Sequence, residues 1–297
     1  MSEARGTLLR LTLMGGQARA FLCDTTGMAQ AAREIHGASN VCTAALGRMI
    51  SAAAMLGAQL KGEQERVTAT ISGGGPAGRL TAVARADGAV KVALEEPRVE
   101  LALRADGKLD VGGALGRDGR LSVMRTQPGA APYVGQVNLV SGEVAEDFAM
   151  YYTASEQTPS LCALGVLVGQ EVRASGGLLV QAMPGCTEEL LGQLEVRAQL
   201  YGAISSALCE MDVHALVGAY FRGLEPQVLQ ETPLRLSCDC DRARIERVLI
   251  SLGAQQLREM IEQDGGAEVC CQFCRRRYAF TAQELTALLE RAGRGDA

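Results

Sequence analysis

Four cysteines near the C-terminus constrain this chain more than any other feature. One residue separates Cys238 from Cys240; thirty residues later, two residues separate Cys271 from Cys274. Two close thiol pairs at this separation suit a tetrahedral site with four thiolate ligands, because each short pair can supply two ligands from one turn. We therefore predict one Zn²⁺ bound by these four residues. Thiolates on zinc are oxidisable, so the residues alone leave both a structural and a redox role open.

Cys270 lies directly beside this motif. Only Cys271 gives the two-residue gap to Cys274 that a metal knuckle favours, so we assign Cys271 as the ligand. Cys270 stays open as a substitute ligand or an extra reactive thiol. The remaining cysteines are predicted to be small buried hydrophobic residues: Cys23, Cys42, Cys162, Cys186 and Cys209.

The N-terminal sequence and the composition indicate where the protein acts and which partners it lacks. The N-terminus lacks a basic region followed by a long apolar run, so we expect no secretory signal and a cytoplasmic protein. The formal net charge of −5 argues against nucleic acid as the default partner. Residues 51–60 are mostly apolar but span only half the roughly 20 residues that cross a membrane. We expect neither a membrane nor a nucleic-acid partner.

The first 186 residues are expected to form one α+β domain. A long helix starting near Asn40 is apolar almost all round, which predicts burial on most faces. Gaps between the expected strands are too short for crossover helices, so the sheet should be largely antiparallel. Strands are expected at 8–13, 17–23, 66–72, 78–85, 89–94, 121–126, 133–140, 162–168 and 177–183, and helices at 28–35, 40–61 and 143–154.

Gly73, Gly75 and Gly78 match the spacing of a dinucleotide-binding fingerprint. That fingerprint needs a helix after the glycines, whose N-terminus receives the pyrophosphate. Pro76 and an alternating strand pattern follow here instead. We therefore predict a tight hairpin turn.

The rest of the chain is expected to form a helical linker over 187–233 and a small module over 234–297. Helical periodicity covers 188–208 and 212–224 in the linker. In the module we expect short strands at 234–236 and 278–280, helices at 243–249 and 255–263, and a last helix opened by a Thr281–Glu284 capping box. A module this small is poorly stabilised by apolar burial alone, so a zinc site would supply folding free energy.

Two other functional classes receive little support. An enzyme needs a positioned nucleophile, base and pocket, and the only histidines, His36 and His214, are expected to be structural or exposed. Arg275, Arg276 and Arg277 beside the last cysteine pair suggest the alternative of a structural zinc-ribbon protein that binds nucleic acid without a redox switch. Residues 238–280 carry seven basic and seven acidic side chains, however, which favours a solvated basic turn. Salt-sensitive retention of DNA or RNA would revive that alternative.

Several motifs resemble one known family. The Cys-x-Cys, thirty-residue, Cys-x-x-Cys pattern resembles that of the redox-regulated heat-shock chaperones (the thirty-three kilodalton heat-shock protein). Residues 173–185 (RASGGLLVQAMPG) resemble the glycine-glycine strand of this family. Residues 146–159 resemble its helix-to-strand junction, and residues 45–48 (ALGR) lie where the family has its buried central helix. Their order and spacing extend the resemblance over roughly residues 5 to 290.

The resemblance implies a cytosolic, ATP-independent holdase that is inactive when reduced and zinc-bound. It implies oxidation to two disulfides, Cys238–Cys240 and Cys271–Cys274, with release of zinc. The module and the linker would then unfold and expose apolar surface that binds unfolding client proteins, and the oxidised form would dimerise. No catalytic residue is implied.

Overall fold

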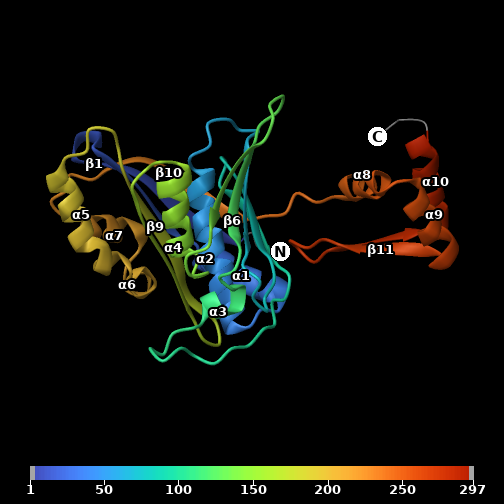
Figure 1. The fold of residues 1–297 in the computed structure, drawn as a ribbon, viewed down its shortest axis with the longest axis horizontal. Helices are drawn as coiled ribbons and strands as arrows, with labels where there is room; N and C mark the ends of the chain where they lie inside the picture. Colours follow the sequence, from blue (N-terminus) through green and yellow to red (C-terminus); the bar gives the residue numbers. More distant parts are fainter. Residues whose placement is uncertain (1–3, 294–297) are drawn as a thin grey trace. The chain divides into compact units, whose positions relative to one another are not determined.

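The computed structural model describes residues 4–293, which divide into two compact units between Ser237 and Cys238 (Figure 1). Its mixed architecture, with a large sheet domain and a small cysteine-bearing unit, confirms the α+β prediction. The expected domain ranges also include residues 1–3 and 294–297, which lie outside the described residues. The division into domain, linker and module otherwise stays a prediction.

Unit 1 is built on one ten-stranded sheet, in the order β7-β6-β3-β4-β5-β10-β1-β2-β9-β8. All neighbours are antiparallel except β10 and β5, which pair in parallel over two residues. The strands are β1 (Arg5–Leu13), β2 (Ala18–Asp24), β3 (Arg66–Ser72), β4 (Leu80–Arg85), β5 (Ala89–Leu94), β6 (Arg120–Thr126), β7 (Tyr133–Asn138), β8 (Ser160–Val168), β9 (Val172–Ala182) and β10 (Gln227–Leu236).

Alternating side chains give this sheet two apolar faces where β1, β2 and β9 meet. Leu8 and Phe21 point into one core cluster, whereas Leu9 and Leu22 point into another. Successive residues of a strand face opposite sides, so both faces need a helical cover. The first cluster holds α2, and the second holds α5, α6 and α7.

Helix α2 (Asn40–Gly57) is the buried central helix that the sequence predicts. Every residue from Val41 to Gly57 is buried except Arg48, and the helix contacts strands in both halves of the sheet (Figure 1). The N-cap is Ser39 rather than the expected Asn40, because the Ser39 side chain accepts a hydrogen bond from Cys42 N at 3.3 Å. The helix also ends at Gly57, four residues earlier than predicted.

Shorter elements connect the strands of unit 1. The expected helix at 143–154 forms as α4 followed by a wider turn, and α3 was not predicted. These elements are the turn η1 (Met14–Gly16), α1 (Thr26–His36), α3 (Val111–Leu115), α4 (Ala145–Met150) and the π-helical turn η2 (Tyr151–Ser155).

The glycine-rich segment between β3 and β4 is a turn, as predicted. No helix follows it, because β4 begins at Leu80. The turn packs tightly on α3: a Cβ on Gly75 would lie 2.4 Å from the Ala114 carbonyl oxygen. Glycine is needed here for close backbone approach, not for a nucleotide.

The linker region is helical in its first two thirds. Helices α5 (Glu188–Tyr201), α6 (Ile204–Glu210) and α7 (Val213–Tyr220) lie together in Figure 1, in yellow. The single helix expected over 188–208 is interrupted after Tyr201, and the helix expected to reach residue 224 ends at Tyr220. After these helices the chain returns to the sheet as β10.

Strand β10 contains the short strand expected at 234–236 and joins it to the large sheet. The apolar residues 234–236 belong to a ten-residue strand that pairs with β1, and Leu234 lies in the large core. Burial against β1 and β5 favours the large sheet over a separate small one. The compact units accordingly divide after Ser237.

Unit 2 contains helices α8 (Arg242–Leu252), α9 (Ala254–Gln263) and α10 (Ala282–Gly293) and a hairpin of β11 (Gly266–Cys270) and β12 (Arg277–Thr281). The capping box is confirmed: Glu284 Oε2 accepts from Thr281 N at 2.8 Å, and Thr281 Oγ1 accepts from Glu284 N at 3.3 Å. Strand β11 was not predicted. Across the described part of both units, no helix combines the length and the apolar character needed to span a membrane.

Candidate metal centre

The four predicted ligands come from two segments of unit 2. Cys238 and Cys240 lie in the extended stretch just before α8, which Asp241 caps by accepting from Arg244 N at 2.6 Å. Cys271 and Cys274 lie in the turn between β11 and β12. The capped helix and the hairpin thus position one cysteine pair each.

The structure brings the four sulfurs together, with every Sγ within 4.8 Å of the others. Two contacts join the two pairs: Cys238 Sγ lies 3.7 Å from Cys271 Sγ, and Cys240 Sγ lies 3.3 Å from Cys274 Sγ. A tetrahedron with zinc–sulfur bonds of about 2.3 Å has edges of about 3.8 Å. The donor set and its spacing therefore fit a tetrathiolate zinc site.

The turn around Cys271 and Cys274 explains why a two-residue gap works here. Cys271 N donates to the Arg276 carbonyl oxygen at 2.9 Å, and Arg275 N donates to the Cys271 carbonyl oxygen at 2.8 Å. Arg275 has a φ of 57°, in the left-handed region that closes such turns. The closed turn places both sulfurs on one side.

The thiols of the cluster differ in acidity. Burial raises the pKa of Cys238, and it raises the pKa of Cys274 to about 11. Burial would also raise the pKa of Cys240, but hydrogen bonds from Tyr278 and the neighbouring thiols lower it to about 7. Zinc needs thiolates, so binding must displace protons from at least the two less acidic groups at neutral pH.

Tyr278 on β12 is a site residue that the sequence analysis missed. Its hydroxyl lies 3.3 Å from Cys240 Sγ and donates to the Cys240 carbonyl oxygen at 3.1 Å. The sequence placed this residue on a strand but gave no signal that its hydroxyl reaches Cys240, 38 residues earlier. A donor of this kind stabilises the thiolate and orients the ligand.

Cys270 lies outside the cluster. It is exposed, and its Sγ lies 3.5 Å from the Arg275 carbonyl oxygen. Neighbouring strand residues point to opposite faces, so the start of the turn directs Cys271 to the cluster and Cys270 away from it.

The other cysteines only partly match the prediction of small buried residues. Cys23 and Cys42 are buried, and burial raises the pKa of Cys23 to about 12, which makes that thiol unreactive. Cys162 and Cys186 are only partly buried, and Cys209 is exposed on α6. Cys162 and Cys186 still pack against the two apolar core clusters, so of these three the prediction is wrong for Cys209, whose position on α6 faces away from the core.

The two histidines and the basic turn after Cys274 make contacts typical of structural and surface residues. His36 is buried with its Nε2 3.1 Å from the Val92 carbonyl oxygen, and the exposed His214 lies 3.3 Å from a carboxylate oxygen of Glu231. In the basic turn, Arg277 forms an ion pair with Glu268 at 3.0 Å.

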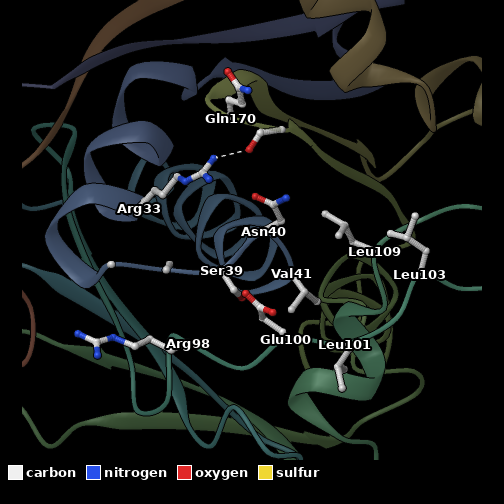
Figure 2. A pocket seen from close by; sticks show the side chains of 13 residues that line it. Arg33, Ser39, Asn40, Val41, Arg98, Glu100, Leu101, Leu103, Leu109 and Gln170 are labelled. Atoms are coloured by element: carbon white, nitrogen blue, oxygen red, sulfur yellow. Dashed lines mark hydrogen bonds between the residues drawn. The ribbon is translucent and has the colours of Figure 1, made fainter.

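Unit 1 has two adjoining hollows. The first, of about 910 Å³, lies at the N-terminus of α2 (Figure 2). Arg33 crosses it to donate to the Gly169 carbonyl oxygen at 2.8 Å. The second, of about 870 Å³, runs along β8, and both are lined by Asn40, Leu103 and Leu109.

Comparison with known proteins shows the family to which this chain belongs. Residues 6–281 match the family model described as Hsp33 protein. The chain is 40% identical over 286 residues to a 33 kDa chaperonin of Alkaliphilus metalliredigens, covering 95% of this chain and 98% of that one. It is 38% identical over 288 residues to that of Clostridioides difficile, covering 96% and 99%.

A solved structure agrees with these matches. The crystal structure of the 33 kDa chaperonin from Thermotoga maritima superposes with a TM-score of 0.87 at 32% identity and covers 98% of this chain and 99% of that one. The chain is therefore a chaperone of the heat-shock class. It belongs to the Hsp33 family, which confirms the resemblance seen in the sequence.

Proposed function

We propose that this chain is an ATP-independent holdase that oxidation switches on. The observation that carries the proposal is the cluster of four sulfurs within 4.8 Å of one another in a small unit. The reduced protein would hold one Zn²⁺ on Cys238, Cys240, Cys271 and Cys274 and be inactive. It would act in the cytoplasm on unfolding proteins, without nucleic acid or membrane as a partner.

Unit 2 has little apolar core to replace a lost metal. Its cluster of buried residues is small: Ile245, Leu249, Ile250, Leu257, Tyr278, Phe280, Leu285 and Leu288. A structural zinc site contributes on the order of 10 kcal/mol to the folding of such a unit. Removing the metal should therefore unfold unit 2.

Oxidation would remove the metal ligands themselves. Two thiolates form one disulfide and pass two electrons to hypochlorous acid, which takes up one proton from the solvent and becomes chloride and water. Two oxidant molecules thus convert all four thiolates and leave no thiolate to bind the ion. We propose the pairs Cys238–Cys240 and Cys271–Cys274, although sulfur contacts of 3.7 and 3.3 Å also join one pair to the other.

The segment 187–233 would couple this switch to client binding. Its helices cover one face of the sheet through buried side chains such as Leu190, Tyr201 and Leu216. If this cover loosens, the apolar face of β1, β2 and β9 becomes available to clients, and two oxidised molecules can associate through it.

The test treats zinc-loaded protein with hypochlorous acid and follows zinc release together with aggregation of a thermally unfolding client. Zinc release and suppression of aggregation should rise together, and a thiol reductant with zinc should reverse both. Equal suppression before and after oxidation would refute the switch while leaving the metal site intact. Peptide mapping of the oxidised protein checks the two disulfides.

A further inference from the structure

Strand β8 leaves one edge of the large sheet without a partner. In the described part of the chain it pairs only with β9, and its nine residues include no charged residue and no proline. Its register with β9 is regular up to the last step, between Leu167 and Val168. Exposed edges are normally protected by charges, prolines or bulges, because their free N–H and C=O groups pair with other strands.

The edge of β8 faces an open groove. Residues 164–168 line the 870 Å³ hollow consecutively. Successive side chains of a strand point to opposite faces, so a hollow that touches five in a row must run along the backbone edge. Alternate residues direct their N–H and C=O groups away from β9, towards this hollow.

The groove has two different walls. One is formed by α2, through Asn40, Ala44 and Arg48, and by the loop that carries Leu103 and Leu109. Leu103 is 61% exposed, so this wall offers apolar contact area. Figure 2 shows Asn40, Leu103 and Leu109 around the adjoining hollow, which extends the groove beyond Val168.

The opposite wall is the junction of α5 and α6. Residues such as Gly202 and Ser205 line it, and a Cβ on Gly165 would lie 2.9 Å from Ser205 Cβ. This wall therefore rests directly on β8. The charged lining residues are Arg48, which is ion-paired with Glu143, and Lys108, which lies 4.0 Å from Asp106, so a neutral occupant fits best.

We propose that the edge of β8 docks an extended, apolar segment of an unfolding client, which adds a further strand to the sheet. Only a partner with the repeat of a peptide backbone can pair with donors and acceptors at alternate residues. Main-chain pairing is largely independent of sequence, as a binder of many clients requires. The proposal rests on the proposed holdase function, since loosening of the α5–α6 wall would widen the groove.

Backbone-modified peptides test this directly on the oxidised full-length protein. The probe is a labelled, neutral peptide of about ten alternating valine and threonine residues, long enough to span a strand. We expect N-methylation of every amide, which leaves all side chains in place, to weaken binding at least tenfold. Methylation of alternate amides leaves one hydrogen-bonding edge intact and should change affinity only a few-fold. Equal binding of all three peptides would overturn the proposal.

Two matched variants place the site. Leu167→Lys puts a charge on the edge of β8, and Val196→Lys puts the same charge on α5, at a side chain that is 83% exposed and outside the groove. Leu167→Lys should weaken peptide binding at least tenfold and Val196→Lys should leave it unchanged. If Leu167→Lys abolishes dimerisation but not peptide binding, the edge docks a second copy and the client assignment is wrong.

The same oxidised samples are tested for suppression of client aggregation. Suppression with equal binding of the three peptides would refute the β8 site and keep the holdase. Lack of suppression would refute the holdase, and the order of the three peptide affinities would still decide whether β8 accepts a strand.

Discussion

Replacing Cys271 by serine should weaken zinc binding far more than replacing its neighbour Cys270. Cys271 is buried, with its Sγ 3.7 Å from Cys238 Sγ, whereas Cys270 is exposed and lies outside the sulfur cluster. Cys271→Ser removes one of four thiolates from the tetrahedron. Cys270→Ser removes none and serves as the matched control.

The magnitude follows from dividing the binding free energy among the ligands. A structural zinc site is worth about 10–16 kcal/mol at neutral pH, or roughly 2.5–4 kcal/mol for each of four thiolates. Since about 1.4 kcal/mol corresponds to a factor of ten, Cys271→Ser should lower zinc affinity by about 10²–10³. Cys270→Ser should change it by less than about threefold.

Competition with a chromophoric zinc chelator at fixed pH measures both affinities. If Cys270 takes the place of the missing ligand, Cys271→Ser will keep more of its zinc affinity than expected. That excess will disappear when Cys270 is also replaced. If Cys270→Ser alone lowers the affinity as strongly as Cys271→Ser, the ligand assignment is wrong.

Three further predictions concern single side chains. Tyr278→Phe removes a hydrogen bond that lowers the pKa of Cys240 and favours its thiolate, so zinc affinity at neutral pH should fall by about 10–100-fold; an unchanged affinity in the chelator competition would contradict this. Burial would raise the pKa of Glu143, but its arginine partner lowers it. The stability that the ionised Glu143 contributes is therefore present above its unfolded-state pKa and lost as pH falls through the lower folded-state pKa. Glu143→Gln should reduce the dependence of the free energy of urea unfolding on acid pH. Identical pH profiles for the variant and the wild type would refute this coupling. Leu257→Ala in the core of unit 2 should destabilise that unit by about 2–5 kcal/mol, and Leu252→Ala, at a 44% exposed position, by much less. Chemical unfolding of the zinc-loaded protein compares them, and equal losses would contradict the packing.

Local patterns sufficed for much of the fold. The apolar run of α2 predicts a buried helix because burial on all faces leaves no polar stripe, and the spacing of the four cysteines predicts a cluster because short pairs converge easily. The exact ends of several helices differ from the prediction. The Ser39 cap and the break after Tyr201 depend on one hydrogen bond or one turn, which neighbouring residues specify only weakly.

Long-range pairing could not be predicted from local patterns. Strand β10 pairs with β1 across more than two hundred residues, and its exposed first half resembles a linker in sequence. The contact of Tyr278 with Cys240 and the groove at β8 likewise arise only after distant segments meet. No sequence period of one strand or helix encodes such contacts.

The sulfur contacts across the two pairs have a topological consequence. A metal held by both pairs ties residue 240 to residue 274, 34 positions later, and so closes a long loop. A permanent covalent link of that span would cost the unfolded chain about 4 kcal/mol of conformational entropy. Disulfides between sequence neighbours would close only tiny rings and return that freedom to the chain. The choice of sulfur partners therefore decides whether oxidation frees the module to unfold or keeps its long loop covalently closed.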